Sequence, residues 1–175
     1  PALKTLFHTT VTKAYPFQKK YIRDLIMLRD DKKIPYVNLF IRIHPLDLYE
    51  NYKEFINTPD FYIDKAGEGG AIGKVEMSYE DLLNLKYSLK YSDININYAS
   101  TISIESCIFD VPVINIGFLD RFALAYEFNH YEPIYKSGAV RLVKTDDELP
   151  QFINMYLENP SLDREHRKRI VADYV

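Results

Sequence analysis

The sequence of 175 residues has little of what marks several common classes of protein. Its single cysteine, Cys107, excludes an internal disulfide and favours a reducing compartment. No apolar run approaches the roughly 18 residues that a membrane-spanning helix needs, and no signal peptide is recognisable. The net charge of −3 argues against a general nucleic-acid binder, although a local positive site can still hold a small anion.

Several motifs that indicate a particular chemistry are also missing. The chain has no Gly-Lys-Ser/Thr ending of a phosphate loop, no spaced dinucleotide fingerprint and no Gly-x-Ser-x-Gly nucleophile turn. No group of His, Cys, Asp and Glu has metal-ligand spacing, so we predict no protein metal site and no bound cofactor. Four of the six glycines fall in residues 64–74, at Gly67, Gly69, Gly70 and Gly73. We interpret this segment as a flexible connector near the ligand edge of the sheet.

What the chain does contain is an alternation of strand and helix patterns, with 47% hydrophobic residues to fill a core. The strand patterns lie at 3–7, 36–43, 61–63, 94–98, 113–116 and 139–143. The helix patterns lie at 16–29, 47–56, 78–91, 102–109, 145–158 and from 164 onward. This alternation predicts an α/β, Rossmann-like domain over residues 1–175, with a mostly parallel sheet and helices on both faces. Because the chain starts without Met and ends inside a helical pattern, we expect it to be a fragment of a larger protein.

Local signals refine some of these elements. Ser78 with Asp81 and Thr145 with Glu148 have the spacing of capping boxes at two helix starts. The last helix is rich in Arg and Lys, which we interpret as a solvated face. Cys107 lies on the apolar side of its helix, so we expect an inert core residue.

Polar residues follow several of the predicted strands. In an open α/β sheet, ligands bind outside the carboxyl ends of the strands, where the strand order reverses. We therefore expect the residues at these ends to share one rim of the sheet. They are His8, Thr9 and Thr10, then Arg42 and His44, then Ser100 and Thr101, and finally Gly117 to Arg121.

These rim residues suggest phosphate chemistry, with a structural alternative for each. Ser100 and Thr101 stand at a helix start, where N–H groups and hydroxyls favour a phosphate, although ordinary helix capping uses the same residues. Glu105 can accept hydrogen bonds from a ribose or be a surface carboxylate. Arg42 offers a forked donor for phosphate, and His44 can donate to a phosphate or have a structural role. His8 and His130 fit structural roles better, and no pair of residues forms a convincing nucleophile and base.

An ordered set of segments resembles a known family. Leu39-Phe-Ile-Arg-Ile-His-Pro45, Ser92-Asp93, Ala99-Ser-Thr-Ile-Ser-Ile-Glu-Ser106 and Asp110-Val-Pro-Val-Ile-Asn-Ile-Gly-Phe118 resemble the C-terminal domain of GT-B fold glycosyltransferases. The surface-polysaccharide and CDP-glycerol-type transferases are the groups most similar to it. The segment from Thr145 to Pro160 is similar to the helix that follows the last strand in these proteins.

The resemblance implies binding of a nucleotide-activated donor, either a nucleotide sugar or a CDP-polyol. Ser100 and Thr101 would bind its phosphate, with Thr9, Thr10 and Gly117 beside them on the rim. Glu105 would bind the ribose, Arg42 a phosphate, and His44 would be the catalytic residue of this half. A missing N-terminal domain would supply the site for a saccharide or lipid-linked acceptor and the usual catalytic base. The implied setting is polysaccharide biosynthesis in the cytoplasm or at the inner face of the cell membrane.

Two alternatives remain open. UDP-N-acetylglucosamine 2-epimerases share the fold, but their pattern has glycines after the serine, where this chain has Thr101 and Ile102. This departure favours a transferase. A non-catalytic assembly module is the second alternative, because 15 tyrosines allow interface patches. The family pattern implies no role for the glycine-rich segment from Gly67 to Gly73.

Overall fold

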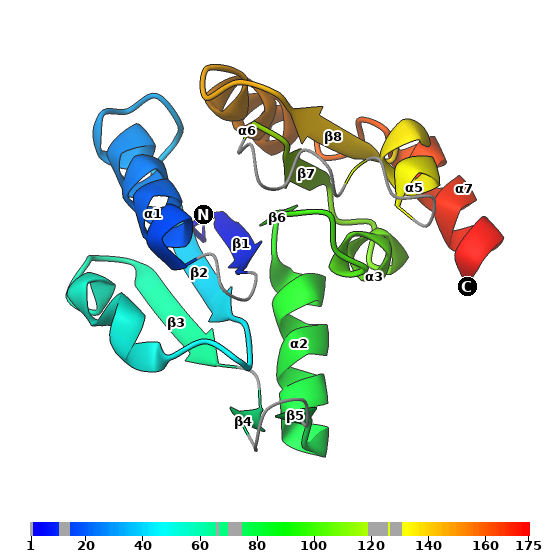
Figure 1. Ribbon diagram of the computed structural model, residues 1–175. Coiled ribbons are helices and arrows are strands. Elements are labelled where there is room, and N and C mark those ends of the chain that lie inside the picture. The colour runs from blue at the N-terminus through cyan, green and yellow to red at the C-terminus, as the bar shows by residue number, and fades with distance from the viewer. Residues whose placement is uncertain (1, 11–14, 66, 70–74, 119–125, 127–130) are drawn as a thin grey trace.

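The chain folds around one six-stranded parallel sheet, as predicted (Figure 1). The structure is a computed structural model that describes residues 2–10, 15–65, 67–69, 75–118, 126 and 131–175. The sheet order is β3-β2-β1-β6-β7-β8. The strands are β1 (Thr5–Thr9), β2 (Asn38–Ile43), β3 (Phe61–Lys65), β6 (Ile94–Asn97), β7 (Val113–Ile116) and β8 (Val140–Val143). The order reverses between β1 and β6, which are distant in sequence but adjacent in the sheet.

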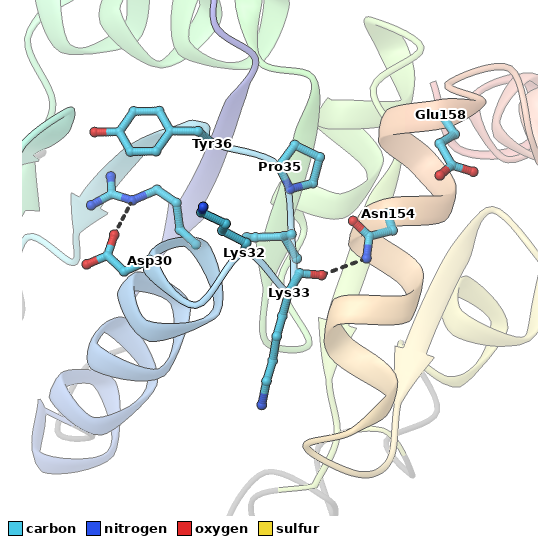
Figure 2. A pocket seen from close by; sticks show the side chains of 9 residues that line it. Asp30, Lys32, Lys33, Pro35, Tyr36, Asn154 and Glu158 are labelled. Atoms are coloured by element: carbon cyan, nitrogen blue, oxygen red, sulfur yellow. Dashed lines mark hydrogen bonds and ion pairs between the residues drawn. The ribbon is translucent and has the colours of Figure 1, made fainter.

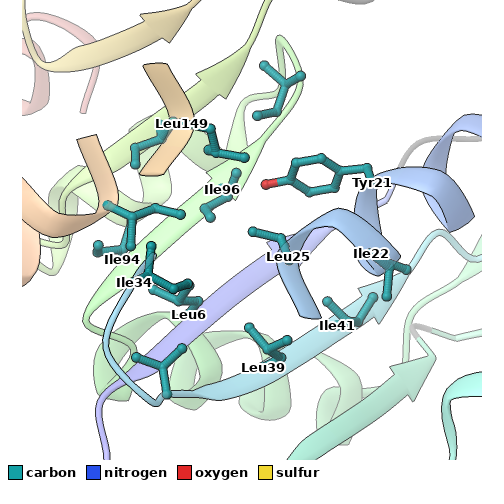
Figure 3. Packing of buried hydrophobic residues seen from close by; sticks show 14 of the residues in the cluster. Leu6, Tyr21, Ile22, Leu25, Ile34, Leu39, Ile41, Ile94, Ile96 and Leu149 are labelled. Carbon is teal, nitrogen blue, oxygen red and sulfur yellow. The ribbon is translucent and has the colours of Figure 1, made fainter. Parts of the chain in front are cut away.

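Helices cover both faces of the sheet, because successive residues of a buried strand point to opposite sides. One face carries α1 (Tyr15–Asp30), the 3₁₀ helix η1 (Tyr49–Phe55) and α6 (Glu148–Glu158). The other carries α2 (Tyr79–Tyr91), α3 (Ile102–Ile108), α5 (Glu132–Lys136) and α7 (Arg164–Tyr174). Figure 3 shows the first face, where Leu6, Leu39 and Ile94 of the strands pack against Leu25 of α1 and Leu149 of α6.

The opposite face of β6 and β7 carries a buried polar network that the sequence did not reveal. Asn97 and Asn115 are fully buried, and Asn115 Nδ2 donates to Asn97 Oδ1 at 2.9 Å. Ser103 Oγ of α3 donates to Asn97 Oδ1 at 3.2 Å. Tyr131 OH donates to Asn115 Oδ1 at 2.7 Å. The polar side of this strand pattern therefore faces neighbouring elements instead of water, and its side chains satisfy one another.

The two predicted capping boxes have different outcomes. The box at α2 is confirmed, because Asp81 N donates to Ser78 Oγ at 3.0 Å and Ser78 N donates to Asp81 Oδ2 at 2.9 Å. The box at Thr145 is wrong, because α6 begins at Glu148 after Asp147 and has no side-chain cap. The Glu148 carboxylate instead accepts from Lys144 N at 2.7 Å. This bond closes the turn that precedes the helix.

Several element boundaries also differ from the prediction. The first strand continues through His8 and Thr9, so these two residues belong to β1 rather than to the loop after it. Inside the glycine-rich segment, the short strand β4 (Glu68–Gly69) pairs with β5 (Val75–Glu76). The short helix α5 was also not predicted from the sequence. Gly70, Gly73, Arg121 and His130 lie outside the described residues.

The basic C-terminal helix is only partly solvated, which corrects the prediction. Arg167 in α7 is fully buried. Its Nε donates to Asp110 Oδ1 at 2.9 Å, and its Nη1 and Nη2 donate to the carbonyls of Leu162 and Pro160 at 2.6 and 2.8 Å. Arg167 thus fastens α7 to the turn after α3. Among the described residues, no helix is long and apolar enough to cross a membrane.

Candidate functional site

The structure brings those predicted rim residues that it describes to the carboxyl-terminal edge of the sheet. Thr9 of β1 pairs in register with Arg42 of β2, and His8 pairs with Ile96 of β6. The chain segments that leave β1 and β6 therefore start on adjacent strands at the point where the strand order reverses. We call this place the switch point. Gly117 follows β7, the next strand along the same edge.

His8 is part of the floor of the switch point. Its side chain is buried, its Nδ1 lies 2.9 Å from Ile96 O, and its Nε2 lies 3.1 Å from Gln18 Oε1. Burial lowers the pKa of His8 from 6.5 to about 4, so the ring is neutral at pH 7. Both neighbouring atoms are acceptors and a neutral ring has one N–H, so the ring donates to only one of them. His8 thus connects β1, β6 and α1 and has a structural role, the alternative that the sequence favoured.

Aromatic rings pack around His8 beneath the switch point. The ring centroids of His8 and Tyr21 are 4.9 Å apart, and those of His8 and Tyr98 are 5.9 Å apart. Tyr21 comes from α1 and Tyr98 from the end of β6, and both are buried. The floor is therefore aromatic and largely excludes water. The tyrosines were visible in the sequence, but only the sheet order places them together.

Thr10 and His44 connect the ends of β1 and β2. Thr10 N donates to Arg42 O at 3.0 Å, which extends the strand ladder by one bond. His44 N donates to Thr10 Oγ1 at 2.8 Å. Thr9 and Thr10 are both buried. The hydroxyl of Thr10 therefore positions the His44 backbone, and any contact with a ligand would be in addition to this bond.

The His44 ring has one nitrogen available for a ligand. Leu46 N donates to His44 Nδ1 at 3.2 Å, so Nδ1 is an acceptor and the proton of the neutral ring lies on Nε2. Nε2 has no hydrogen-bond partner in the part of the chain that the structure describes. Burial lowers the pKa of His44, and the nearby carboxylate of Asp47 opposes this shift. The ring is therefore suited to donate a hydrogen bond from Nε2 at neutral pH.

Asp47 holds the turn that carries His44. It is 7% exposed, and its Oδ1 accepts from Leu48 N and Asn51 Nδ2, both at 2.8 Å. Its Oδ2 accepts from Tyr52 OH at 2.6 Å. The carboxylate thus fixes the backbone between β2 and η1. The sequence pattern placed Asp47 only at the start of the 47–56 helix pattern and did not predict its bond from Tyr52.

Arg42 already has partners in the folded domain. Its guanidinium is 4% exposed, forms an ion pair with Asp64 of β3 and donates from Nη2 to Asp81 O at 3.0 Å. It therefore bridges β2, β3 and the first turn of α2. A phosphate at Arg42 would compete with the Asp64 carboxylate. The predicted phosphate contact stays a prediction, and the geometry gives Arg42 a structural role in any case.

The turn between β6 and α3 contains polar side chains with few internal partners. Thr101 precedes α3 and makes no side-chain capping bond, while Ser100 Oγ accepts only a long bond of 3.4 Å from Ile102 N. Glu105 is half-buried and has no hydrogen-bond or ion-pair partner among the described residues. Burial raises the pKa of its carboxyl group. Ordinary capping by Thr101 therefore does not explain this turn, and Glu105 is not a salt-bridged surface carboxylate within the described chain.

Gly117 has a packing explanation. Gly117 N donates to Val143 O at 2.8 Å, so the backbone of β7 stays close to that of β8. A Cβ at this position would lie 2.6 Å from Leu142 Cδ1 and 3.1 Å from Val143 O. A larger residue would require the Leu142 side chain to move and Val143 O to give by a few tenths of an ångström, so glycine suits this close approach. Tyr126 strengthens the same edge, because its OH donates to Ile116 O at 2.8 Å and accepts from Ala99 N at 3.2 Å.

The described residues contain no group of three or more His, Cys, Asp or Glu side chains that could hold a metal ion. The prediction that the protein has no metal site remains a prediction. Cys107 is buried, as expected, and burial raises the pKa of its thiol to about 12. A thiol with this pKa is protonated at neutral pH and is a poor nucleophile or metal ligand.

The strand order and the switch point define a Rossmann-like α/β domain, the class that binds ligands at the carboxyl ends of its strands. The sequence matches no protein-family model and no curated protein. Solved structures with the same fold do match. They include the UDP-GlcNAc 2-epimerase from Neisseria meningitidis bound to UDP-GlcNAc, with a TM-score of 0.58 and 16% identity. They also include WaaG, a glycosyltransferase of lipopolysaccharide biosynthesis, with a TM-score of 0.54 and 11% identity. MurG from Acinetobacter baumannii matches with a TM-score of 0.53 and 14% identity.

These matches confirm the α/β fold that the resemblance implied. The matches cover 97%, 100% and 98% of this chain, but only 39%, 44% and 46% of the three solved chains in the same order. The chain thus spans less than half of the length of the proteins that it resembles. At these identities the similarity shows the fold alone.

Proposed function

We propose that the chain is the donor-nucleotide-binding domain of a glycosyltransferase or polyol-phosphate transferase of cell-surface polysaccharide biosynthesis. The observation that carries the proposal is the turn between β6 and α3 at the switch point. There the hydroxyl of Thr101 and the carboxylate of Glu105 have no internal partner among the described residues. Polar groups without an internal partner, at the edge where this fold class binds ligands, are available to form hydrogen bonds with a ligand.

In this proposal each part of the donor meets a matching group. Ser100 and Thr101 contact the phosphate next to the transferred group, with the backbone N–H groups of their turn. The Glu105 carboxylate accepts from the ribose hydroxyls. His44 donates from Nε2 to the phosphate or to the transferred group, and its tautomer suits this role. The fold class supports this placement, because its ligands lie at the carboxyl ends of strands.

The reaction would be a direct displacement at the donor carbon or phosphorus. The bond from the transferred group to the nucleotide phosphate breaks, and an acceptor hydroxyl forms the new bond. Negative charge then grows on the departing phosphate, where hydrogen bonds from the rim stabilise it without a protein-bound metal or cofactor. The saccharide or lipid-linked acceptor and the base that activates it belong to a second domain. The share of the solved proteins that this chain spans supports such a domain.

Calorimetric titration of the chain with UDP, CDP, GDP and CMP tests this function. We expect one of them to bind with a dissociation constant on the order of 1 mM or lower. The double variant Ser100→Ala, Thr101→Ala should weaken binding by about 1–3 kcal/mol, the range for lost hydrogen bonds to a charged group. Glu105→Gln should weaken the binding of the nucleoside diphosphate but leave the binding of inorganic pyrophosphate unchanged. Glu50→Gln, an exposed carboxylate of η1, is the matched control. No binding by any of the four nucleotides would refute the proposal.

The epimerase alternative makes a different prediction for the longer protein. An epimerase would convert its sugar nucleotide without any acceptor, whereas a transferase would leave the donor unchanged until an acceptor is added. A non-catalytic module would bind no nucleotide and would self-associate. Size-exclusion chromatography with and without nucleotide separates that last alternative from the two enzymes.

A further inference from the structure

A large open cavity lies at the edge of the sheet opposite the switch point. It is bounded by the end of α1, the segment that leads into β2, and the last turns of α6 (Figure 2). Its volume is about 860 Å³, which is within the range of small-molecule sites. Because β2 begins here and ends at the rim, the cavity is separated from the candidate donor site by the length of the sheet. It goes beyond the function proposed above.

A buried arginine forms part of the cavity wall. Arg29 is 2% exposed and comes from the last turn of α1. Its Nε donates to Asp30 Oδ1 at 3.1 Å and its Nη1 donates to Pro59 O at 2.9 Å. Its Nη2 has no acceptor among the described residues. A guanidinium that is this well buried ordinarily satisfies all of its donors. Nη2 is not among the enclosed polar atoms that lack a partner, so it reaches solvent and can donate to a ligand in the cavity.

Two lysines add positive charge at the same cavity. Lys32 and Lys33 form part of its lining, and neither ammonium group has an ion-pair partner in the described chain. Their backbone is fixed, since Lys32 has a φ of 60° and the carbonyl of Lys33 accepts from Asn154 Nδ2 at 2.9 Å (Figure 2). The two lysine side chains therefore extend from a backbone segment that is held in place by a tertiary contact.

Two acidic residues limit the charge that the cavity can accept. Asp30 is paired with Arg29, and Glu158 comes from the last turn of α6 on the opposite side. Three positive and two negative side chains leave a net charge of +1. A ligand with one anionic group fits this balance, whereas a polyanion would meet the carboxylates of Asp30 and Glu158.

The remaining wall is apolar. The Tyr36 ring lies over Arg29 with its centroid 4.9 Å from Cζ, and Pro35 and Ile34 continue the same side of the cavity. Tyr36 is 48% exposed, although its OH donates to Asp60 Oδ2 at 2.8 Å. The ring therefore stays in place and presents a surface to a ligand. Rings of this kind pack against the flat, apolar face of an organic molecule.

We propose that this cavity is a second ligand site, which binds one phosphate or carboxylate group carried on a small organic body. Arg29 Nη2 and the ammonium group of Lys32 hold the oxyanion, while Lys33 adds positive charge at the margin of the cavity. Tyr36 and Pro35 hold the body. The site is specific for a single anionic group, because Asp30 and Glu158 oppose a second one.

Nuclear magnetic resonance titration of the ¹⁵N-labelled chain tests this site. The probes are inorganic phosphate, glucose 6-phosphate and glucuronate, with glucose as the neutral control. We expect saturable shifts of the backbone amides of Ile34 and Tyr36 and of the Asn154 side-chain amide. Comparing the dissociation constants of glucose 6-phosphate and glucuronate shows whether the site prefers a phosphate or a carboxylate group. Either anionic sugar should bind more tightly than phosphate alone, because only the sugars contact Tyr36.

Variants separate the site from general electrostatics. The double variant Lys32→Gln, Lys33→Gln should raise the dissociation constant at least tenfold, while Lys168→Gln, an exposed lysine of α7, should leave it unchanged. Arg29→Lys keeps the charge but loses the fork, and should also weaken binding. Thermal unfolding shows whether that variant folds, and the lysine variants decide the question if it does not.

Two results would overturn the proposal. One is the absence of saturable shifts with all three anions at concentrations on the order of 10 mM. The other is that the anions shift amides near Thr10 and Ser100 instead, because this would place the only anion site at the rim. A nucleotide that shifts only the amide resonances of the rim would support the proposed function. The cavity is tested separately, by phosphate, glucose 6-phosphate and glucuronate.

Discussion

Protonation of His8 is expected to destabilise the folded domain as the pH falls from 7 to 5. Burial lowers the pKa of His8 from 6.5 to about 4, against the opposing effects of its bonds to Gln18 and Ile96. The unfolded chain therefore binds a proton at a higher pH than the folded chain. Stability from this residue is fully present above about pH 6.5 and is lost as the pH falls toward 4.

The size of the effect follows from the pKa difference. A shift of 2.5 units, from 6.5 to about 4, corresponds to about 3 kcal/mol once the pH is below both values. Between pH 7 and pH 5 the same relation gives a loss of about 2 kcal/mol. This loss is a large part of the free energy of unfolding of a typical folded domain, which is roughly 5–15 kcal/mol.

Urea unfolding of the wild-type chain and of His8→Gln at pH 7, 6 and 5 measures this effect. The variant should be less stable at pH 7, since the packing around Tyr21 changes, but its free energy of unfolding should depend less on pH. His44→Gln is the control, because His44 is only half-buried and the shift of its pKa is smaller in consequence. Equal pH dependence in wild type and His8→Gln would refute the assignment of the effect to His8.

Two further substitutions test the buried polar groups. Arg167→Met should destabilise the domain by about 3 kcal/mol, because it leaves Asp110 Oδ1 and two backbone carbonyls without their donor, although Asp110 Oδ2 keeps its bond from Arg164. Urea unfolding checks this, and an equal loss in the exposed Arg169→Met would contradict it. Tyr131→Phe should cost about 1–2 kcal/mol, because Asn115 Oδ1 then lacks its donor in the interior. An unchanged melting temperature would show that the network does not depend on this hydroxyl.

Much of the fold could be predicted because the signals are local. The capping box of Ser78 and the apolar runs of β2 and β7 lie within a few residues of the structure that they specify. The failure at Thr145 has a local cause as well, since Glu148 bonds Lys144 N one residue before the expected cap. Helix α5 was missed because it has only five residues, too few for a helical period to show.

The candidate site could be predicted in outline only. The carboxyl ends of parallel strands share an edge, so the sequence order of Thr10, His44 and Ser100 was enough to expect them on one rim. Whether each side chain was already engaged could not be predicted. Arg42 has Asp64 as its partner, whereas Glu105 has no partner in the described chain, although both are charged residues at comparable positions.

The sequence by itself determined the strand and helix elements, the parallel sheet and the edge where a ligand would bind. These follow from hydrophobic periodicity and from the geometry of parallel strands, which need no knowledge of distant contacts. Only the tertiary structure decided which polar residues are internal. Arg167 and Asn115 are buried and satisfied by partners 5 to 57 residues away, while the side chains of Thr101 and Glu105 have no partner in the described chain. The physical reason is that hydrogen-bond satisfaction of a buried group depends on the atoms that the fold brings to it, and no local pattern contains them.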